Sequence, residues 1–362
     1  MSVPLSTIDL GDRERALVTE AVTAGWISGT GGYIGRFEKA LTARIGRAHV
    51  VAVNSGTSAL ELALAALGIG SGDEVIVPAL TFVSPAAAVR TCGARPVLCD
   101  IEPSTWTIDA DAAKRLVSRH TRAIIAVDLL GYVSDYATLQ AIGLPVIEDA
   151  AQAHGARRWG QPAGSFGTMS VFSFHANKAV TTGEGGCVAT DDPAIASRLR
   201  VIANHGMTPQ RPYYHEVVGR NLRMTNLSAA IGVGQVERWD ELVAARINVE
   251  MRYRALLEQS GAWFRTPDAE SEPSCWLATI SIDGRDELVG ALGARGIDSR
   301  AIWPDLPSLP LYSSFAPWPC PVAAEVSRTT AWLPTWSGMP TDQIEEVASA
   351  VNELLERVGR HA

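Results

Sequence analysis

The chain has 362 residues, of which 47% are hydrophobic and 19% are charged. A folded protein of this length usually contains more than one hydrophobic core, so a small binding module and a disordered chain are both excluded. Its 31 basic and 39 acidic side chains give a formal net charge of -8 without long runs of one sign, which argues against a nucleic-acid-binding surface.

The first segment is polar where a signal peptide would be apolar, with charges at Asp9, Asp12, Arg13 and Glu14. The longest apolar stretches are interrupted by charged residues or prolines, so we expect no membrane span. The five cysteines are an odd number without a CxxC pair, which favours free thiols over disulfide bonds or a thiolate metal site. We therefore expect a cytoplasmic protein with no metal site and no nucleic-acid or membrane partner.

The glycine-rich segment 29–35 resembles the phosphate-binding turn of dinucleotide-binding proteins. That motif works only where a buried strand runs into a helix, and residues 23–28 supply no such strand. We therefore interpret the segment as a surface loop. A nicotinamide-dependent oxidoreductase that uses these glycines remains an alternative.

From about residue 50, short β-branched runs alternate with segments of helical length. These runs are apolar on both faces, which predicts strands buried under helices in a mostly parallel sheet and therefore an α/β domain. The predicted strands are residues 50–53, 75–77, 96–98, 123–127, 145–147, 171–174 and 186–189.

Residues 227–258 contain no proline and repeat apolar residues at helical spacing, which predicts one or two long helices that leave this domain. A boundary near residue 240 gives a large α/β domain over residues 1–240 and a smaller α+β domain over residues 241–362. Within the smaller domain we predict strands at 275–282 and 296–303, a helix at 285–294, a long loop at 303–321, and a last helix after Pro340 with Thr341 as its N-cap.

The predicted strand 50–53 runs into residues 54–58 and then into a helix. A helix start carries unpaired N–H groups and the positive end of the helix dipole, and Gly56 lets the backbone approach a phosphate. The segment therefore predicts an anion site, although Asn54 or Ser55 could simply cap the helix.

Asp149 follows the strand 145–147, at the end where open parallel sheets bind ligands. A carboxylate there could hold a proton on a heteroaromatic nitrogen, whereas a solvated strand end is the alternative. Lys178 lies in a turn after the strand 171–174, and a lysine amine can form an imine with an aldehyde cofactor if part of it is neutral. A lone loop lysine is usually a surface charge. The combination of Lys178 with a predicted anion site, Asp149 and the hydroxyl of Ser173 favours a functional lysine instead.

At these residues the sequence resembles the pyridoxal-phosphate sugar aminotransferases of the DegT/DnrJ/EryC1/StrS family. The resemblance implies fold type I, the aspartate aminotransferase-like fold. It extends over nearly the whole chain and rests on residues 25–28, 36–38, 54–60, 72–78, 148–152, 172–174, 178, 183–186 and 223–226.

The resemblance implies a role for each matching residue. Lys178 would form the imine with pyridoxal 5'-phosphate and act as general acid and base, and Asp149 would keep the pyridine nitrogen protonated. Gln152 would bond the ring hydroxyl and Phe82 would lie against the ring face. The implied phosphate ligands are Gly56, Thr57, Ser58, Ser173 and, from the neighbouring subunit, Asn221. The resemblance thus also implies a homodimer with shared active sites.

Within the family, residues 177–178 and 181–186 look most like the nucleotide-sugar 4-aminotransferases of the perosamine synthase type. The implied reaction is ping-pong amino transfer from an amino acid, expected to be L-glutamate, through pyridoxamine 5'-phosphate to a nucleotide-linked 4-keto-6-deoxy sugar. Alternatives are a C3-keto-sugar or cyclitol aminotransferase of the family and a non-catalytic binding protein. A dehydratase of this family would carry histidine in place of Lys178.

The chain departs from many of the family's members at Asp128, Leu222, Pro307 and Trp336, where they have histidine or tyrosine. A lost hydrogen bond to a sugar or diphosphate oxygen costs about 1–3 kcal/mol, so we expect an unusual acceptor. The candidate substrate contacts are Trp336 and Arg300, which could bind a phosphate with two donors. A solvated surface arginine is the alternative for Arg300.

Overall fold

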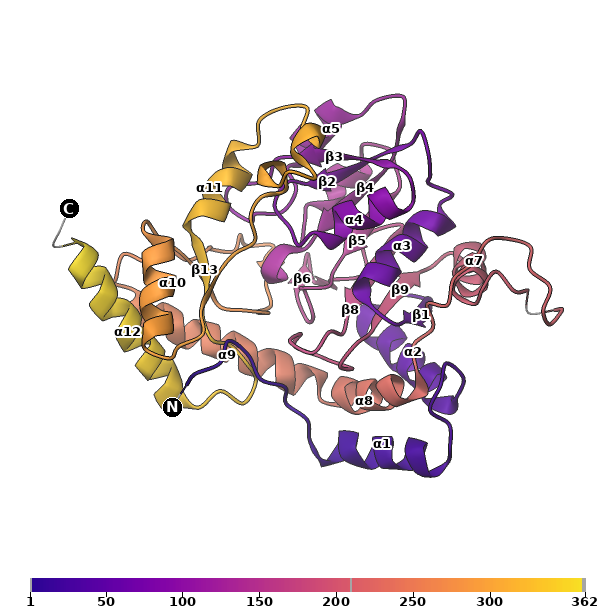
Figure 1. Cartoon of the computed structure of the whole chain (residues 1–362), viewed down its shortest axis with the longest axis horizontal. Helices are drawn as coiled ribbons and strands as arrows, with labels where there is room; N and C mark the ends of the chain where they lie inside the picture. Colours follow the sequence, from indigo (N-terminus) through magenta and orange to yellow (C-terminus); the bar gives the residue numbers. More distant parts are fainter. Residues whose placement is uncertain (1, 209, 360–362) are drawn as a thin grey trace.

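The seven runs predicted as strands form one sheet in the computed structural model, which describes residues 2–208 and 210–359 (Figure 1). β9 is antiparallel to both of its neighbours and the other pairs are parallel, so the prediction of a mostly parallel sheet is confirmed. In their spatial order the strands are β1 (His49–Val53), β9 (Gly186–Thr190), β8 (Met169–Ser173), β5 (Val146–Asp149), β4 (Thr121–Val127), β2 (Glu74–Pro78) and β3 (Arg95–Cys99).

Helices cover both faces of the sheet because successive residues of each buried strand face opposite sides. In β4, Ile125 packs into one hydrophobic core and Ile124 into another. The first core is covered by α3 (Gly56–Ala66), α4 (Ser84–Thr91) and α7 (Pro193–Ala203). The second is covered by α1 (Asp12–Thr23), α2 (Gly32–Ile45), α5 (Ala110–Leu116), α6 (Tyr136–Gln140) and α8 (Asn226–Glu237).

The glycine-rich segment is not a loop throughout, because α2 begins at Gly32 with Gly31 as its N-cap. Neither is it a dinucleotide motif, since the described segment that precedes it contains no strand. The Asn226 side chain accepts the N–H of Tyr33, and a Cβ at Gly31 would overlap that side chain. Gly31, with φ of 157°, is therefore needed for the close approach of α8 to the start of α2.

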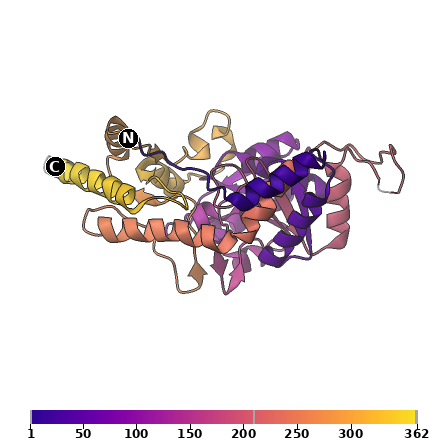
Figure 2. The same ribbon diagram turned by 90° about the horizontal axis from the view of Figure 1, so that it is seen from below.

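The predicted helical region 227–258 forms α8 and α9 (Trp239–Leu257), which are separated at Arg238. Trp239 of α9 packs in the second core, whereas Tyr253 packs in a third core in the C-terminal part of the chain. Figure 2 shows α9 running from the sheet-containing part to the C-terminal helices. One continuous helix therefore fixes the two parts relative to each other.

The third core lies among α9, α10 (Arg285–Ala294), α12 (Thr341–Gly359) and a three-stranded antiparallel sheet. The strands of that sheet are β11 (Thr279–Ser281), β13 (Thr330–Trp332) and β12 (Arg300–Ala301), with β13 in the centre. The remaining short elements are β6 (Arg157–Arg158), β7 (Gln161–Pro162), β10 (Ser271–Glu272), α11 (Pro321–Thr329) and the 3-10 turns Leu129–Gly131, Leu306–Ser308 and Ser313–Phe315.

Two predictions for this part were wrong in extent. The predicted strands 275–282 and 296–303 shrink to β11 and β12, because residues such as Trp276 leave the sheet to contact the larger part of the molecule. Thr341 is the first residue of α12 rather than its cap, and its hydroxyl accepts a hydrogen bond from Arg252. No helix among the described residues has both the length and the apolar character that a membrane crossing needs.

The first core provides a direct test of packing. Leu62 of α3 is fully buried, so Leu62→Ala should lower the free energy of unfolding by about 2–5 kcal/mol, because it removes apolar contacts and leaves a cavity. Leu311 is 64% exposed, and Leu311→Ala should change that free energy by no more than about 0.5 kcal/mol. Urea denaturation followed by circular dichroism measures both values. Equal values for the two variants would contradict this assignment of the core.

Candidate active site

A pocket of about 330 Å³ lies at the carboxyl ends of β2, β5 and β8. Parallel strands end at the same edge, so side chains that are far apart in the sequence meet there. The pocket brings together eight of the predicted site residues, namely Gly56, Thr57, Phe82, Asp149, Gln152, Ser173, Lys178 and Arg300. Its other walls come from the C-terminal part of the chain, including Trp276, Trp303 and Trp332.

The start of α3 forms one end of the pocket. The Ser55 hydroxyl caps the helix by accepting the N–H of Ser58 at 3.0 Å, so that donor is already used. In the described part of the chain no acceptor faces the N–H groups of Gly56 and Thr57, which both line the pocket. A Cβ at Gly56 would lie 2.8 Å from the Ser173 Cβ, so glycine is needed where α3 meets β8. This end of the pocket therefore offers two backbone donors and the Ser173 hydroxyl to an anion.

Asp149 and Lys178 face this pocket from neighbouring segments, and burial shifts both of their pKa values. Burial raises the pKa of Asp149 to about 6, although one carboxylate oxygen accepts the N–H of Ala151 at 3.1 Å. Burial also lowers the pKa of Lys178 to about 7, against the opposing effect of the Asp149 charge. At neutral pH a substantial fraction of Lys178 is therefore the neutral amine, which is the nucleophilic form.

The position of Lys178 is set by residues that the sequence analysis missed. The Lys178 Nζ lies 3.5 Å from the centre of the Trp276 ring. The Trp276 indole donates to the carbonyl of Asn177 at 2.9 Å, and buried Arg246 of α9 donates to the carbonyls of both Trp276 and Lys178. Nothing in the helical pattern of residues 227–258 distinguishes Arg246 from a surface arginine.

An aromatic wall faces the anion end. The Trp303 ring centre lies 5.8 Å from that of Phe82, 5.9 Å from Trp276 and 4.7 Å from Trp332. These tryptophans were not predicted, and their only sequence signal is the high tryptophan count of 10. They make one side of the pocket apolar and aromatic, which suits a ring that lies against Phe82.

Gln152 is oriented by the backbone opposite it. Its amide oxygen accepts the N–H of Leu130 at 2.9 Å, which leaves the amide nitrogen as its donor toward the pocket. Leu130 has φ of 54°, in the left-handed region that costs free energy for a leucine. The strained turn at Leu130 thus fixes which end of the Gln152 amide faces a ligand.

Three predicted site residues lie outside this pocket. Ser58 is directed to Ser55, as described above, and Trp336 is buried in the third core, where it packs with the C-terminal helices. Asn221 is exposed, pairs with Asn204 and accepts a hydrogen bond from Arg223 at 3.1 Å. Trp336 therefore has a packing position in its own chain, and its contact with a substrate stays a prediction.

The other departures from the family pattern also lie away from the pocket. Leu222 packs in the first core, and Pro307 belongs to the 3-10 turn Leu306–Ser308. Asp128 is fully buried and accepts hydrogen bonds from the Ser134 N–H and the Tyr136 hydroxyl, and burial raises its pKa. Within one chain none of these residues lines the pocket, and the unusual acceptor stays a prediction.

Taken together, the pocket residues fit a flat heteroaromatic aldehyde that carries a phosphate. The anion would lie at the start of α3, the ring against Phe82, the ring nitrogen at Asp149 and the aldehyde at Lys178. Among the described residues, no three histidine, cysteine, aspartate or glutamate side chains are grouped closely enough to hold a metal ion.

Comparisons with known proteins agree with this geometry. The model of the DegT/DnrJ/EryC1/StrS aminotransferase family matches residues 9–352. The chain is 39% identical over 357 residues to GDP-perosamine synthase of Caulobacter vibrioides, with 96% of each chain covered. It is 36% identical over 333 residues to dTDP-3-amino-3,4,6-trideoxy-alpha-D-glucose transaminase of Streptomyces venezuelae, which covers 89% of this chain and 87% of that relative.

Solved structures give the same result. Spr1654 of Streptococcus pneumoniae in its PLP form has a TM-score of 0.93 to this chain at 27% identity, covering 99% of this chain and 100% of that one. Its PMP form has a TM-score of 0.93 at 26% identity, covering 98% and 100%.

The lowered pKa of Lys178 can be tested on the protein without any ligand. A lysine reacts with acetic anhydride as the neutral amine, so acetylation of Lys178 should rise with pH and reach half of its maximum near pH 7. Pulse acetylation followed by peptide mass spectrometry measures this profile, and the exposed Lys39 in the same digest corrects for reagent decay at each pH. A half-point above pH 9 at Lys178 would show that its surroundings do not favour the neutral form.

Proposed function

The chain belongs to the DegT/DnrJ/EryC1/StrS aminotransferase family, and we propose that it transfers the amino group of L-glutamate to the keto group of a nucleotide-linked 4-keto-6-deoxy sugar. The chain is a pyridoxal-phosphate-dependent transaminase of fold type I. The observation that carries the proposal is the meeting of Lys178, Asp149 and the start of α3 in one pocket. The identity of 39% with a GDP-perosamine synthase supports amination at C4 of the sugar.

The pocket residues divide the binding of pyridoxal phosphate among them. The N–H groups of Gly56 and Thr57 and the Ser173 hydroxyl would hold the phosphate, and the amide nitrogen of Gln152 would donate to the ring oxygen. When bound, the cofactor supplies an electron sink for the carbon that gains or loses the amino group. The protein supplies position and proton transfer.

Lys178 is the proposed general acid and base. When the Lys178 amine is neutral, its Nζ would take a proton from the amino-acid carbon, and it would then give that proton back on the same side of the pocket. A pKa near 7 suits both proton transfers at neutral pH. The bond from Arg246 to the Lys178 carbonyl and the Trp276 ring limit where Nζ can reach. These contacts would keep the proton transfer within one side of the bound ring.

Asp149 has a different task from Lys178. Above about pH 6 its carboxylate is ionised, and a cationic ring nitrogen beside it would favour that form further. A buried carboxylate with its second oxygen free of the Ala151 bond can hold a proton on the ring nitrogen. Asp149 would therefore maintain the charge state of the ring throughout both halves of the reaction.

We further propose that the working unit is a cytoplasmic homodimer. Asn221 is exposed and lies outside the pocket of its own chain, which is the position expected of a residue that completes the phosphate site of a second subunit. The five cysteines are free thiols, as expected in a reducing compartment. We also retain the proposal of a large domain over residues 1–240 and a small one over 241–362.

A second candidate is amination at C3 of the sugar. It is favoured by the 36% identity to the Streptomyces venezuelae transaminase, whose name records an amino group at that carbon. Both candidates use the same residues for proton transfer and differ only in which sugar carbon is presented to Lys178.

An acceptor assay separates these candidates. With L-glutamate and a GDP-4-keto-6-deoxy hexose, we expect equal amounts of 2-oxoglutarate and a 4-amino sugar nucleotide, measured by mass spectrometry. The matched variant Lys178→Ala should lower turnover by more than about a hundredfold while it still binds pyridoxamine phosphate. Product from a 3-keto substrate alone would favour the second candidate. Substantial turnover by Lys178→Ala would refute the role of the lysine.

The shared site can be tested through cofactor retention. Asn221→Ala should weaken retention of pyridoxal phosphate during dialysis by about tenfold, since one hydrogen bond to a charged phosphate is lost. When Asn221→Ala and Lys178→Ala chains are co-expressed with different tags, a mixed dimer should contain one intact site and recover about half of the wild-type activity per dimer. No recovery in the isolated mixed dimer would place Asn221 outside the partner's site.

A further inference from the structure

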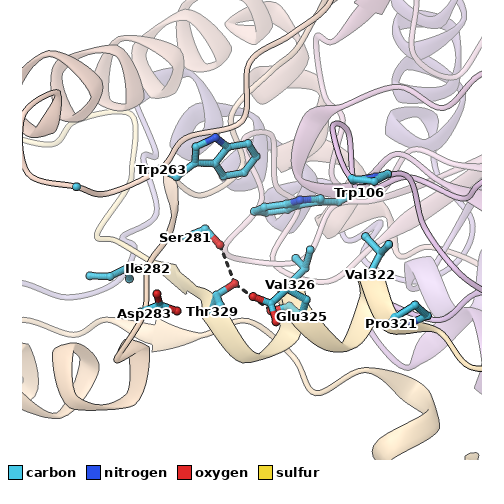
Figure 3. A pocket seen from close by; sticks show the side chains of 12 residues that line it. Trp106, Trp263, Ser281, Ile282, Asp283, Pro321, Val322, Glu325, Val326 and Thr329 are labelled. Atoms are coloured by element: carbon cyan, nitrogen blue, oxygen red, sulfur yellow. Dashed lines mark hydrogen bonds between the residues drawn. The ribbon is translucent and has the colours of Figure 1, made fainter. Parts of the chain in front are cut away.

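A second cleft, of about 590 Å³, lies between α11 and the loop that follows β3 (Figure 3). It is larger than the active-site pocket, and among the described residues the two cavities share no lining residue. The strand β13 separates them: Thr329, just before it, lines this cleft, and Trp332, at its end, lines the active-site pocket. The cleft is therefore a separate site of a size typical for small ligands.

Two indole rings form one wall of the cleft. Trp106 and Trp263 have ring centres 5.9 Å apart, and Figure 3 shows them on the side opposite to α11. Trp106 is buried with φ of 61°, and the buried Arg265 lies 4.5 Å from its ring centre while donating to the carbonyls of Thr105 and Leu129. Trp263 remains 46% exposed although hydrogen bonds to Ser281 fix its backbone. The wall is thus preformed, and its exposed part is the indole of Trp263.

The wall formed by Ser281, which is paired with Trp263 through the backbone, and by Thr329 of α11 presents hydrogen-bond acceptors. The Thr329 hydroxyl donates to the carbonyl of Glu325 at 2.9 Å, so the Ser281 hydroxyl, 2.8 Å away, must donate to Thr329. Ser281 then accepts from Thr330 at 3.1 Å. All three hydroxyl hydrogens are committed within the protein, and the oxygens of Ser281 and Thr329, which line the cleft, each keep one lone pair for a ligand. The side-chain oxygens of this wall therefore suit a ligand rich in donors.

The charge of the cleft is negative. Of the described residues that line it, Asp283 and Glu325 carry charge and both are acidic. Arg328, outside the cleft, pairs with Asp283 at 3.7 Å and donates to both carboxylate oxygens of Glu325 at 2.8 to 3.3 Å, so these three exposed side chains together leave one net negative charge. A phosphate-bearing ligand would be repelled. A cation would be attracted, and it would favour Trp263 because Arg265 already occupies one face of Trp106.

We propose that this cleft binds an amino sugar that carries no phosphate, with its ring against Trp263 and its ammonium group toward Glu325 and Asp283. The hydroxyl groups of such a ligand supply the donors that the Ser281 and Thr329 oxygens lack, and its amine supplies the positive charge. The site goes beyond the proposed transfer reaction. Ligand binding to the cleft is measured without amino transfer, so a failure of this proposal can be told apart from a failure of the proposed acceptor.

The test is isothermal titration of the holoenzyme with D-glucosamine at a pH where its amine is protonated. We expect saturable binding, which Trp263→Ala and Glu325→Gln each weaken by about tenfold or more. The control variant Trp159→Ala removes a partly exposed indole elsewhere and should leave the affinity unchanged. Circular dichroism of each variant separates a lost contact from a lost fold, and Glu325→Gln alters an exposed side chain.

Three further probes define the ligand class. N-acetyl-D-glucosamine lacks the charge, D-glucosamine 6-phosphate adds an anion, and putrescine has ammonium groups without a sugar ring. We expect each to bind at least about tenfold more weakly than D-glucosamine. The proposal is overturned if D-glucosamine does not bind, if it binds Trp263→Ala and Glu325→Gln as well as it binds the wild type, or if any of the three probes matches its affinity.

Discussion

The burial of the Lys178 amine is the constraint on which the rest of the active site depends. An exposed lysine is almost fully protonated at neutral pH, whereas here burial lowers the pKa to about 7. That burial is produced by the C-terminal part of the chain, since Trp276 lies against Nζ and Arg246 holds the carbonyls of both residues. The long helix α9 therefore helps to bury the proposed catalytic lysine, although it contributes no reacting group of its own.

The sheet supplies the other half of this arrangement. The carboxyl ends of β5 and β8 place Asp149 and Ser173 at one edge, and α3 starts at the same edge after β1. Gly56 and Gly186 have no side chain where α3, β8 and the end of β1 meet, and a Cβ on either would overlap a neighbour. The close contact at these glycines places the unpaired N–H groups of α3 within the same pocket as the buried carboxylate and amine.

Tryptophan has different roles in the two cavities. In the active-site pocket, Trp276, Trp303 and Trp332 pack on one another and on Phe82, so they form a fixed apolar wall. In the second cleft, the Trp263 face stays exposed beside carboxylates. The first arrangement buries the Lys178 amine against an indole, whereas the second leaves an indole available to a cation. The neighbouring polar groups therefore decide whether an indole serves as an apolar wall or as a surface for a cation.

The sequence alone predicted the seven central strands and the helices α8, α9, α10 and α12, because buried strands and helix starts leave local patterns of apolar residues, glycines and caps. It also identified Lys178 and Asp149 as the proposed functional residues. It did not reveal β13, Arg246, the tryptophan wall or the packing of Trp336. These depend on contacts between segments far apart in the chain, and an arginine or tryptophan looks the same locally whether it faces solvent or a buried amine. Only the tertiary structure, by bringing α9 and the C-terminal sheet against the lysine turn, decided which of them matter.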